Sequence, residues 1–549
     1  MLGLMQDRPL SLPVIFHRVE RMFAHKRVIS AHSTGETITD WGEVCRRARG
    51  LAEVLDRLGV PADARVGTFA WNSRRHVELY LAVPCTGRVL HTINHRLFGD
   101  QIRYIVNDAA DDILFVDRSI LATVWPLANG FPTVRYIVVM DDGDQTPLPD
   151  DPRVLDYEQL LAQASPRTAP FTVPDENRAA ALCYTSGTTG NPKGVLYSHR
   201  SVVLHALLLL TVDAFGLGER DVVMPIVPMF HVNAWGLPYA AMLCGADLVL
   251  PGPAMRPQSL AAQMARHRVT FSGAVATVWR SLLPQLDKHD LSSLRQIISG
   301  GGAVDEALSE AYRQRLGLAL TNAWGMTETS PVVTVSRVAT VHDNLTREQQ
   351  RQLIATPGPA IPLTELRIVD EDGSELPWDG STPGELQAAG ATIASGYFGA
   401  RPAPEAFTDD GWLRTGDVAT IDQYGYVRIV DRTKDLVKSG GEWISTVELE
   451  AIMTDPRVAE AAIIGIEDPH WGERPLAYVV SQPDQHPTAE DIRRHLGKHV
   501  AAWWIPEKVV FLDEIPKTAT GKFAKQTLRA RYREQAANPP PPQPEQDPR

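Results

Sequence analysis

The sequence has little of what marks disulfide-rich or metal-clustered proteins. Its 549 residues include only four cysteines, Cys45, Cys85, Cys183 and Cys244, and their spacing matches no metal-binding pair. Each lies near apolar neighbours, so we expect buried free thiols, which suits a reducing, cytoplasmic environment. No internal repeat is visible in the sequence.

Long apolar runs and an excess of basic charge are also missing. The longest apolar run, Val202 to Val212, contains His205 and is too short to span a bilayer, so it predicts a buried helix. The first twelve residues predict no signal peptide, because a polar Gln-Asp-Arg-Pro stretch interrupts them. The net charge of −12 argues against a general nucleic-acid-binding surface, although a local basic groove could still hold a polyphosphate.

What the sequence does contain predicts a multidomain α/β protein. Its length exceeds what one hydrophobic core supports, and a hydrophobic fraction of 44% is ordinary for a globular chain. Helical and strand-like patterns alternate over residues 13–140, which predicts parallel sheets covered by helices. Residues 141–174 predict a surface connection, and residues 446–530 predict a small second α/β unit.

Residues 184–194, with the sequence YTSGTTGNPKG, predict a phosphate-binding loop between two strands. Glycine lets backbone N–H groups close on an anion, hydroxyl groups add donors, and Lys193 adds a positive charge. The stretch is not a Walker loop, because Lys193 is followed by glycine. The alternative is a flexible surface loop without a ligand. The candidate phosphate ligands are Thr185, Ser186, Gly187, Thr188, Thr189, Gly190 and Lys193.

Later segments supply candidate nucleotide and metal ligands. In residues 320–329, LTNAWGMTET, the ring of Trp324 can stack on adenine, Thr327 can donate to a phosphate oxygen, and Glu328 offers a hard oxygen ligand for Mg²⁺. Asp417 follows a predicted strand and a glycine, an arrangement that can hold two ribose hydroxyls. The Thr-Gly-Asp segment that ends at Asp417, taken alone, also fits a structural turn.

Six motifs, in this order, resemble those of the adenylate-forming enzymes, which include the acyl- and aryl-CoA synthetases. The resemblance spans the chain from about Val14 to Arg529. The sequences HVNAW and KSGGEWIS are typical of the fatty-acyl-CoA synthetase branch. The motifs are the phosphate loop, PMFHVNAWG at 228–236, LTNAWGMTET at 320–329, the TGD that ends at Asp417, the hinge segment 428–445 and PKTATGK at 516–522.

The resemblance implies a fold and a reaction. The fold is α/β, with a large N-terminal domain of parallel-sheet layers at residues 1–432, a small mobile α/β domain at residues 433–535 and a disordered Pro-rich tail at residues 536–549. The implied activity is an ATP-dependent fatty acid–CoA ligase, which forms acyl-AMP and pyrophosphate and then acyl-CoA and AMP. ATP, Mg²⁺, CoA and a medium- or long-chain fatty acid are the expected partners, and no nucleic acid is expected.

The resemblance also implies the site residues. Lys522 is the expected catalytic residue of the first step, together with His231, Thr327 and Glu328, and Thr185 and Glu328 are the expected metal ligands. The remaining expected nucleotide contacts are Gly302, Asn322, Ala323, Trp324, Asp417, Arg432, the hinge residue Lys434, Lys438 and Trp443. The acid and CoA are expected at His231, Val232, Gly301, Gly440, Gly441 and Trp235, which would act as a gate on the acyl tunnel.

Several alternatives stay open. The acid could be short and sulfur-containing, such as methylthiopropionate, and oxidative luciferase-like chemistry could accompany ligation. An acyl-AMP ligase that delivers to a carrier protein is disfavoured, because no inserted segment is seen between Ser330 and Gly384. A non-catalytic sensor is disfavoured by the intact Glu328, Asp417 and Lys522. A homodimer is a further implication of the fatty-acyl branch, and a lipid-like substrate would favour peripheral membrane contact.

Overall fold

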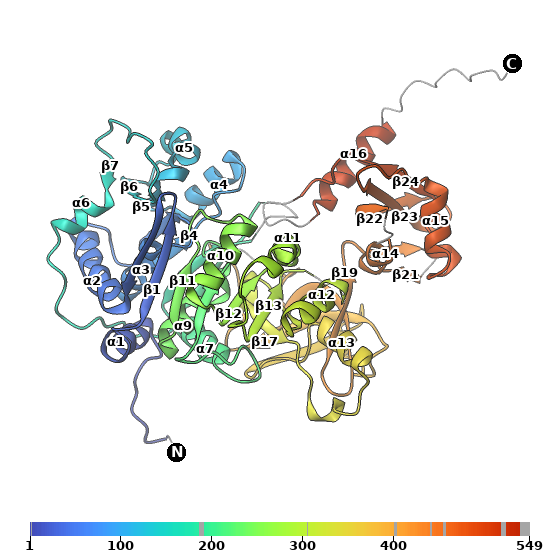
Figure 1. The fold of residues 1–549 in the computed structure, drawn as a ribbon, viewed down its shortest axis with the longest axis horizontal. Coiled ribbons are helices and arrows are strands. Elements are labelled where there is room, and N and C mark those ends of the chain that lie inside the picture. The colour runs from blue at the N-terminus through green and yellow to red at the C-terminus, as the bar shows by residue number, and fades with distance from the viewer. Residues whose placement is uncertain are drawn as a thin grey trace.

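Two large sheets form the body of the protein, and a smaller C-terminal unit stands beside it (Figure 1). The computed structural model describes residues 1, 3–185, 191–302, 304, 306–399, 403–439, 442–453, 457–517 and 523–537. The predicted α/β class, with a large N-terminal part and a smaller C-terminal part, is confirmed.

The seven-stranded sheet has the order β7-β6-β5-β3-β4-β8-β9 and is parallel except at its β8–β9 edge. That edge pairs the two strands that flank the predicted phosphate loop, so the expected strand–loop–strand arrangement is confirmed. The strands are β3 (Arg65–Phe69), β4 (Val89–Thr92), β5 (Ile113–Asp117), β6 (Tyr136–Met140), β7 (Val154–Asp156), β8 (Ala179–Tyr184) and β9 (Gly194–Ser198).

The eight-stranded sheet has the order β15-β14-β13-β12-β10-β11-β1-β2 and is parallel except at its two edges. Its parallel strands therefore end along one edge, where an open α/β sheet commonly places its ligand. The strands are β1 (Arg27–His32), β2 (Gly35–Asp40), β10 (Val222–Pro225), β11 (Asp247–Leu250), β12 (Phe271–Ala274), β13 (Gln296–Gly300), β14 (Leu320–Gly325) and β15 (Val332–Val335).

Helices fill the space between the two sheets and cover their outer faces. One apolar core joins both sheets to α1, α2, α3, α7 and α9, while α10, α11 and α12 cover the far side of the eight-stranded sheet and α4 and α5 that of the seven-stranded sheet. The helices are α1 (Leu12–Met22), α2 (Trp41–Arg57), α3 (Arg74–Cys85), α4 (Gly99–Ala109), α5 (Leu121–Val124), α6 (Tyr157–Ala162), α7 (His199–Leu209), α8 (Val232–Trp235), α9 (Leu237–Cys244), α10 (Pro257–His267), α11 (Ala276–Leu282), α12 (Glu306–Leu316), α13 (Arg347–Ala355), α14 (Thr446–Ile452), α15 (Ala489–Leu496) and α16 (Lys525–Ala537).

Strand β5 shows why the chain forms these layers. All five of its residues are buried, as a parallel strand between two helical layers requires. Ile113 and Phe115 face the helices between the sheets, and Leu114 and Val116 face α4 and α5. A strand alternates its side chains between its two faces, so one apolar run supplies both cores.

Two further sheets complete the chain. A four-stranded antiparallel sheet precedes the hinge segment, and a five-stranded sheet forms the C-terminal unit with α14, α15 and α16. The sequence predicted parallel layers for the N-terminal part and did not anticipate this antiparallel sheet. The strands are β16 (Thr364–Val369), β17 (Gly384–Gly390), β18 (Leu413–Ile421), β19 (Val427–Arg432), β20 (Val437–Ser439), β21 (Glu442–Ile444), β22 (Val458–Asp468), β23 (Gly472–Ser481) and β24 (Lys508–Phe511).

One sequence expectation is wrong in part. Residues 141–174 are not only a surface connection, because they include β7 and α6. The proline- and aspartate-rich composition obscured a short strand that extends the seven-stranded sheet beside β6. It also obscured a helix that carries a fully buried side chain, Tyr157.

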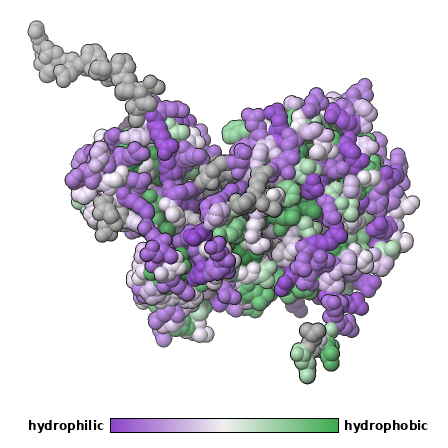
Figure 2. Space-filling model, turned by 180° about the vertical axis from the view of Figure 1, so that it is seen from behind, coloured by the Kyte–Doolittle hydropathy of each residue, from purple (hydrophilic) through white to green (hydrophobic). Residues whose placement is uncertain are grey.

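The surface is mostly hydrophilic, as Figure 2 shows for one face. Apolar side chains protrude on the N-terminal segment, where Met1, Leu4 and Met5 are exposed. Within the described part of the chain, every helix is too short or too polar to cross a bilayer. All four cysteines are free and buried, as the sequence predicted.

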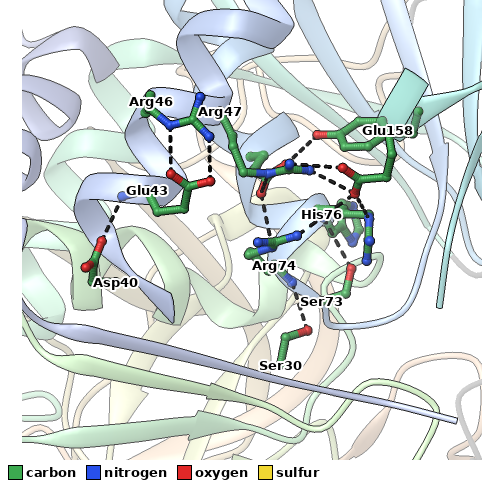
Figure 3. Close-up of polar contacts among 12 residues, drawn as sticks. Ser30, Asp40, Glu43, Arg46, Arg47, Ser73, Arg74, His76 and Glu158 are labelled. Atoms are coloured by element: carbon green, nitrogen blue, oxygen red, sulfur yellow. Dashed lines mark hydrogen bonds and ion pairs between the residues drawn. The ribbon is translucent and has the colours of Figure 1, made fainter. Parts of the chain in front are cut away.

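A cluster of arginines and carboxylates locks α2, α3 and α6 together (Figure 3). Glu78 is completely buried, and its Oε1 lies 2.7 Å from Nε of Arg47 and 3.3 Å from Nε of Arg74. The hydroxyl of Tyr157 donates to the other oxygen of Glu78 at 2.6 Å. Arg47 also forms two hydrogen bonds with Glu158, at 2.9 and 3.0 Å. Glu78 is thus the buried counter-charge on which the cluster depends.

We expect Glu78→Ala to lower the free energy of unfolding by about 3–5 kcal/mol, because it leaves two guanidinium groups without their buried partner. Glu43→Ala is the matched control, since Glu43 pairs with the exposed Arg46 on the same helix and should cost about 1 kcal/mol or less. Chemical denaturation of both variants measures the difference. Equal losses would show that the buried carboxylate has no special role.

Candidate active site

A cavity of about 420 Å³ opens at the carboxyl edge of the eight-stranded sheet. The ends of β10, β12, β13 and β14 and the loops that follow them supply most of its walls, as expected for an open α/β sheet. Many residues predicted from the sequence lie in these walls: Thr185, Lys193, His231, Val232, Trp235, Gly301, Ala323, Trp324, Thr327, Glu328, Arg432 and Lys434.

One buried carboxylate organises the nucleoside side of the cavity. Asp417 on β18 is 3% exposed, and its Oδ2 accepts a hydrogen bond of 2.9 Å from the indole N–H of Trp324. Its other oxygen lies 2.7 Å from Nε of Arg432, which pairs with Asp417 across β18 and β19. The carboxylate therefore fixes the orientation of the aromatic ring and of the guanidinium group, and the three predicted nucleoside contacts lie together.

Glu328 forms the phosphate side of the same cavity. It is 5% exposed, and its Oε1 accepts a hydrogen bond of 2.8 Å from the hydroxyl of Tyr397. Burial raises the pKa of Glu328 above the usual value of a glutamate, and the hydrogen bond from Tyr397 offsets part of that rise. Nζ of Lys193 lies 4.7 Å from the centre of the Tyr397 ring and 2.7 Å from the exposed carboxylate of Glu405.

The oxygen ligands suit Mg²⁺ held jointly by protein and substrate. Among the described residues, no three His, Cys, Asp or Glu side chains form a cluster that could hold a metal ion by themselves. Mg²⁺ commonly takes only one or two carboxylates from the protein and completes its shell with water and substrate phosphates. A single buried carboxylate, that of Glu328, in a cavity that Thr185 also lines fits that pattern.

Five predicted nucleotide ligands do not line the cavity, and Asp417, which contacts two residues that do, is one of them. Gly302 is exposed beyond the residues that line the cavity. The side-chain amide of Asn322 donates to the carbonyl of Ala355 at 2.9 Å. Lys438 pairs with Glu371 at 3.1 Å, and Trp443 lies beside it, 5.5 Å from its Nζ to the ring centre. In this arrangement the last two residues belong to the surface of the C-terminal unit.

Other predicted site residues lie outside the described residues, and their roles stay predictions. These are Ser186, Gly187, Thr188, Thr189, Gly190, Gly440, Gly441 and Lys522. Their flanks are described. Thr185 and Lys193 are joined where the phosphate loop begins and ends, because the Thr185 N–H donates to the Lys193 carbonyl at 2.9 Å and the Lys193 N–H donates to the Thr185 hydroxyl at 3.1 Å.

Sequence reasoning missed several residues of the cavity, among them Tyr397 and Arg96. Tyr397 belongs to a Gly-Tyr-Phe segment, and only its contact with Glu328 reveals its place. Arg96 lines the cavity with its guanidinium carbon 5.8 Å from the centre of the Phe230 ring. No motif identifies Tyr397, while the basic side chain of Arg96 in a polar HTINHR segment was the one available signal.

The hinge segment is anchored from the C-terminal helix. Arg529 on α16 donates to the carbonyl of Lys434 at 3.1 Å and to Asp435 at 2.8 Å. On the same helix, Lys525 lies 2.7 Å from Glu450 and donates to the hydroxyl of Thr446 at 2.6 Å. Helix α16 is therefore tied to the hinge segment and to α14.

Comparison with known proteins agrees with this geometry. The profile of the AMP-binding enzyme family matches residues 16–398, and that of the AMP-binding enzyme C-terminal domain matches residues 448–522. The chain belongs to the AMP-binding enzyme family. The adenylate-forming resemblance drawn from the motifs is thereby confirmed.

Relatives in other organisms align with this chain over nearly their whole length. A long-chain-fatty-acid–CoA ligase of Thermus thermophilus is 45% identical over 535 residues, 96% of this chain and 97% of that protein. A 3-methylmercaptopropionyl-CoA ligase of Ruegeria lacuscaerulensis is 41% identical over 538 residues, 97% and 99% of the two chains. The crystal structure of an anthranilate CoA ligase in complex with anthranoyl-AMP superposes with a TM-score of 0.83 at 27% identity, covering 97% of this chain and all of that one.

We expect Asp417→Asn to weaken the binding of AMP by roughly 10- to 100-fold, because it removes a buried charged acceptor from Trp324 and Arg432. Isothermal titration calorimetry measures the affinity. Asp410→Asn is the control, because Asp410 pairs with Arg367 at the surface, outside the cavity lining. An equal loss in both variants would contradict a nucleoside role for Asp417.

Proposed function

We propose that the protein is an ATP-dependent fatty acid–CoA ligase. The observation that carries the proposal is one cavity that is lined by Trp324 and Arg432, both held by Asp417, by the buried carboxylate of Glu328 and by apolar residues around Trp235. A nucleotide, a reacting carboxylate and an acyl chain can share such a cavity. Two relatives of 45% and 41% identity are named acyl-CoA ligases, which supports the same reaction class.

In the first step the carboxylate of the acid attacks the α-phosphorus of ATP, and pyrophosphate leaves with the bonding electrons. The carboxylate, the α-phosphate and the leaving pyrophosphate are all anionic, so neutralising their charge is the main task of the site. We assign that task to Lys522, to Lys193 and the loop residues 186–190 around the leaving pyrophosphate, and to Thr327. His231, in the cavity wall between nucleotide and acyl sides, would orient the carboxylate.

Glu328 and Thr185 would hold Mg²⁺, which supplies further positive charge to the phosphates when bound. Glu328 suits this role because it is buried. In a region of low dielectric constant, its ionised carboxylate attracts a cation more strongly than it would in water. Tyr397 keeps the carboxylate oriented and favours its ionised form.

In the second step the CoA thiolate attacks the acyl carbonyl, and AMP leaves. We propose that the C-terminal domain, residues 433–535, rotates about Lys434 between the steps, which withdraws Lys522 and brings Gly440 and Gly441 to the site. Lys438 and Trp443 would enter with that rotation, in keeping with their position away from the cavity here.

The acid is proposed to be a medium- or long-chain fatty acid, because the cavity wall around Val232 and Trp235 is apolar. A second candidate is a short sulfur-containing acid, supported by the 41% identical 3-methylmercaptopropionyl-CoA ligase. The proposal includes a cytoplasmic location, in keeping with four free cysteines, and peripheral membrane contact, which a lipid-like substrate would favour. It also includes a homodimer, on the fatty-acyl resemblance.

A ligation assay tests the proposal. The purified protein is incubated with ATP, Mg²⁺ and linear acids from two to eighteen carbons, or with 3-methylthiopropionate, with and without CoA, and the products are identified by mass spectrometry. Acyl-CoA that forms only when CoA is present supports the proposal, and the preferred acid decides between the two candidates. Acyl-AMP that accumulates unchanged in the presence of CoA would contradict the second step, and no product from any acid would contradict the proposal as a whole.

Lys522→Ala should lower ATP–pyrophosphate exchange by about 100-fold or more, because it removes a cation from the adenylation transition state. The variant should still convert synthetic acyl-AMP and CoA into acyl-CoA. Lys517→Ala is the control in the same segment, since Lys517 pairs with Glu460 on the C-terminal unit. An unchanged rate of ATP–pyrophosphate exchange in Lys522→Ala would contradict the catalytic role of Lys522.

Tyr397→Phe should move the acid limb of the adenylation rate to higher pH. The hydrogen bond from Tyr397 lowers the pKa of Glu328, so loss of this hydrogen bond raises that pKa further. As the solution is acidified, the Glu328 carboxylate then becomes protonated at a higher pH. The pH profile of kcat/KM for ATP measures the shift. Tyr424→Phe, at an exposed tyrosine on another loop, should leave the profile unchanged. A shift to lower pH would contradict the assignment.

A further inference from the structure

Near its end, strand β19 carries a buried carboxylate that contacts the C-terminal unit. Asp431 is 1% exposed, and its Oδ2 accepts hydrogen bonds from the N–H and from the hydroxyl of Thr446, the second at 2.7 Å. The N–H of Val447 adds a longer contact of 3.4 Å to the same oxygen. Thr446 and Val447 begin α14, whereas Asp431 belongs to the four-stranded sheet. The contacts therefore join residues that lie before and after Lys434 in the chain.

Asp431 accepts backbone groups of α14 that the helix itself cannot satisfy. The first N–H groups of a helix have no partner within the helix. Ser445 is the N-cap of α14, and its side chain accepts from the N–H of Glu448 at 3.1 Å. The N–H groups of Thr446 and Val447 are left to the carboxylate, and a charged acceptor forms stronger hydrogen bonds than a neutral one. The start of α14 therefore depends on a residue outside its own unit.

The hydroxyl of Thr446 extends this contact to α16. Thr446 is fully buried, and its hydroxyl accepts a hydrogen bond of 2.6 Å from Nζ of Lys525 while it donates to Asp431. A hydroxyl has one proton to donate, so the ammonium group of Lys525 directs that proton towards the carboxylate. Lys525 stands three residues after Lys522 in the chain, so the same contact connects β19 with the helix that follows the proposed catalytic lysine.

A neighbouring hydrogen bond crosses the same boundary. The hydroxyl of Ser445 donates to the carbonyl of Val430 at 2.6 Å. We call the hydrogen bonds between residues 430–431 and residues 445–447 the latch. None of these residues lines the cavity, so the latch acts on the position of the C-terminal unit and not on a bound substrate.

A rotation of the C-terminal unit about Lys434 has to break the latch. Its two sides lie on opposite sides of that residue in the chain, so their relative position changes when one part turns. Breaking the latch removes three donors from the buried carboxylate of Asp431, which costs more than the loss of an exposed contact. Lys438 and Glu371 span the same boundary, but their side chains are 55% and 77% exposed, and such a pair contributes little. The latch is therefore the stronger of these two restraints.

We propose that the latch holds the C-terminal unit in the arrangement that serves adenylation, and that it opens before the thioester is formed. The proposal rests on the proposed function, which supplies the rotation, and it names the contacts that oppose this rotation. In the present arrangement Lys438 lies away from the cavity, as the step before thioester formation requires. Asp431 and Thr446 are then positioning residues, which set the ratio between the two arrangements.

Thr446→Val provides the test, because it removes the hydroxyl and keeps the N–H and the shape of the side chain. Thr488→Val is the matched control, since Thr488 is the N-cap of α15 in the same unit and its hydroxyl donates to Asp491 at 2.8 Å. Both variants lose one hydroxyl at the start of a helix of the C-terminal unit. They differ in whether that hydroxyl reaches the large domain. Asp431→Asn, which removes the charge at nearly constant volume, is the second test variant.

The first readout is the ratio of the two half-reaction rates, ATP–pyrophosphate exchange and the conversion of synthetic acyl-AMP and CoA into acyl-CoA. Each rate is proportional to the population of its own arrangement, and a hydrogen bond to a charged group contributes a factor of about 10 or more. We expect the ratio of exchange to thioester formation to fall about 10-fold in Thr446→Val and in Asp431→Asn. Thr488→Val should leave it unchanged. A lower content of folded protein reduces both rates equally and does not change the ratio.

An unchanged ratio in both test variants would overturn the latch. A wild type that makes no acyl-CoA from any acid would instead overturn the proposed function, and because the wild type is measured first, the two failures are distinguishable.

The second readout needs no substrate. All four native cysteines are buried, so cysteines introduced at the exposed Ser281, on α11, and Lys498, after α15, can be spin-labelled selectively. Double electron–electron resonance then measures the distances between the large domain and the C-terminal unit. We expect Thr446→Val to raise the population of a second distance about 10-fold relative to the first, and Thr488→Val to match the wild type. A distance distribution identical in Thr446→Val and the wild type would overturn the latch even for an inactive protein.

Discussion

The carboxylate of Asp417 is the interaction on which the site depends. It connects the indole of Trp324, at the end of the eight-stranded sheet, with the guanidinium of Arg432, at the end of β19. Because the carboxylate is almost fully buried, both partners are needed to compensate its desolvation. Arg432 lies two residues before Lys434, so the same carboxylate anchors the end of the strand that leads into the proposed hinge.

The local motifs could be predicted from the sequence, because they are short and each contains its own chemistry. The strands around the phosphate loop, the helices of residues 446–530 and the cavity positions of Glu328 and Trp324 follow from adjacent residues. The role of Tyr397 could not be predicted, since its contact with Glu328 joins positions 69 residues apart. The antiparallel sheet and β7 were missed for the same reason. Whether a short, weakly patterned segment forms a strand depends on the strands with which it pairs.

Two lysines that the sequence predicts for the site are paired with surface carboxylates in this arrangement. Lys193 pairs with Glu405, and Lys438 pairs with Glu371. Exposed pairs of this kind contribute about 1 kcal/mol or less, so a polyphosphate of higher charge can displace the carboxylates at little cost. Of the two lysines, Lys193 lies in the cavity wall, so Glu405 is the carboxylate that would compete with substrate phosphates there.

The two ends of the cavity differ in how they are made rigid. The nucleotide end is held by charge, through Asp417 and Glu328. The acyl end is held by apolar packing instead, such as that of the buried Trp235 indole against Gly273 and Gly300, which involves no charge. The ion pair and hydrogen bonds of the nucleotide end therefore do not depend on the side chains that line the acyl end.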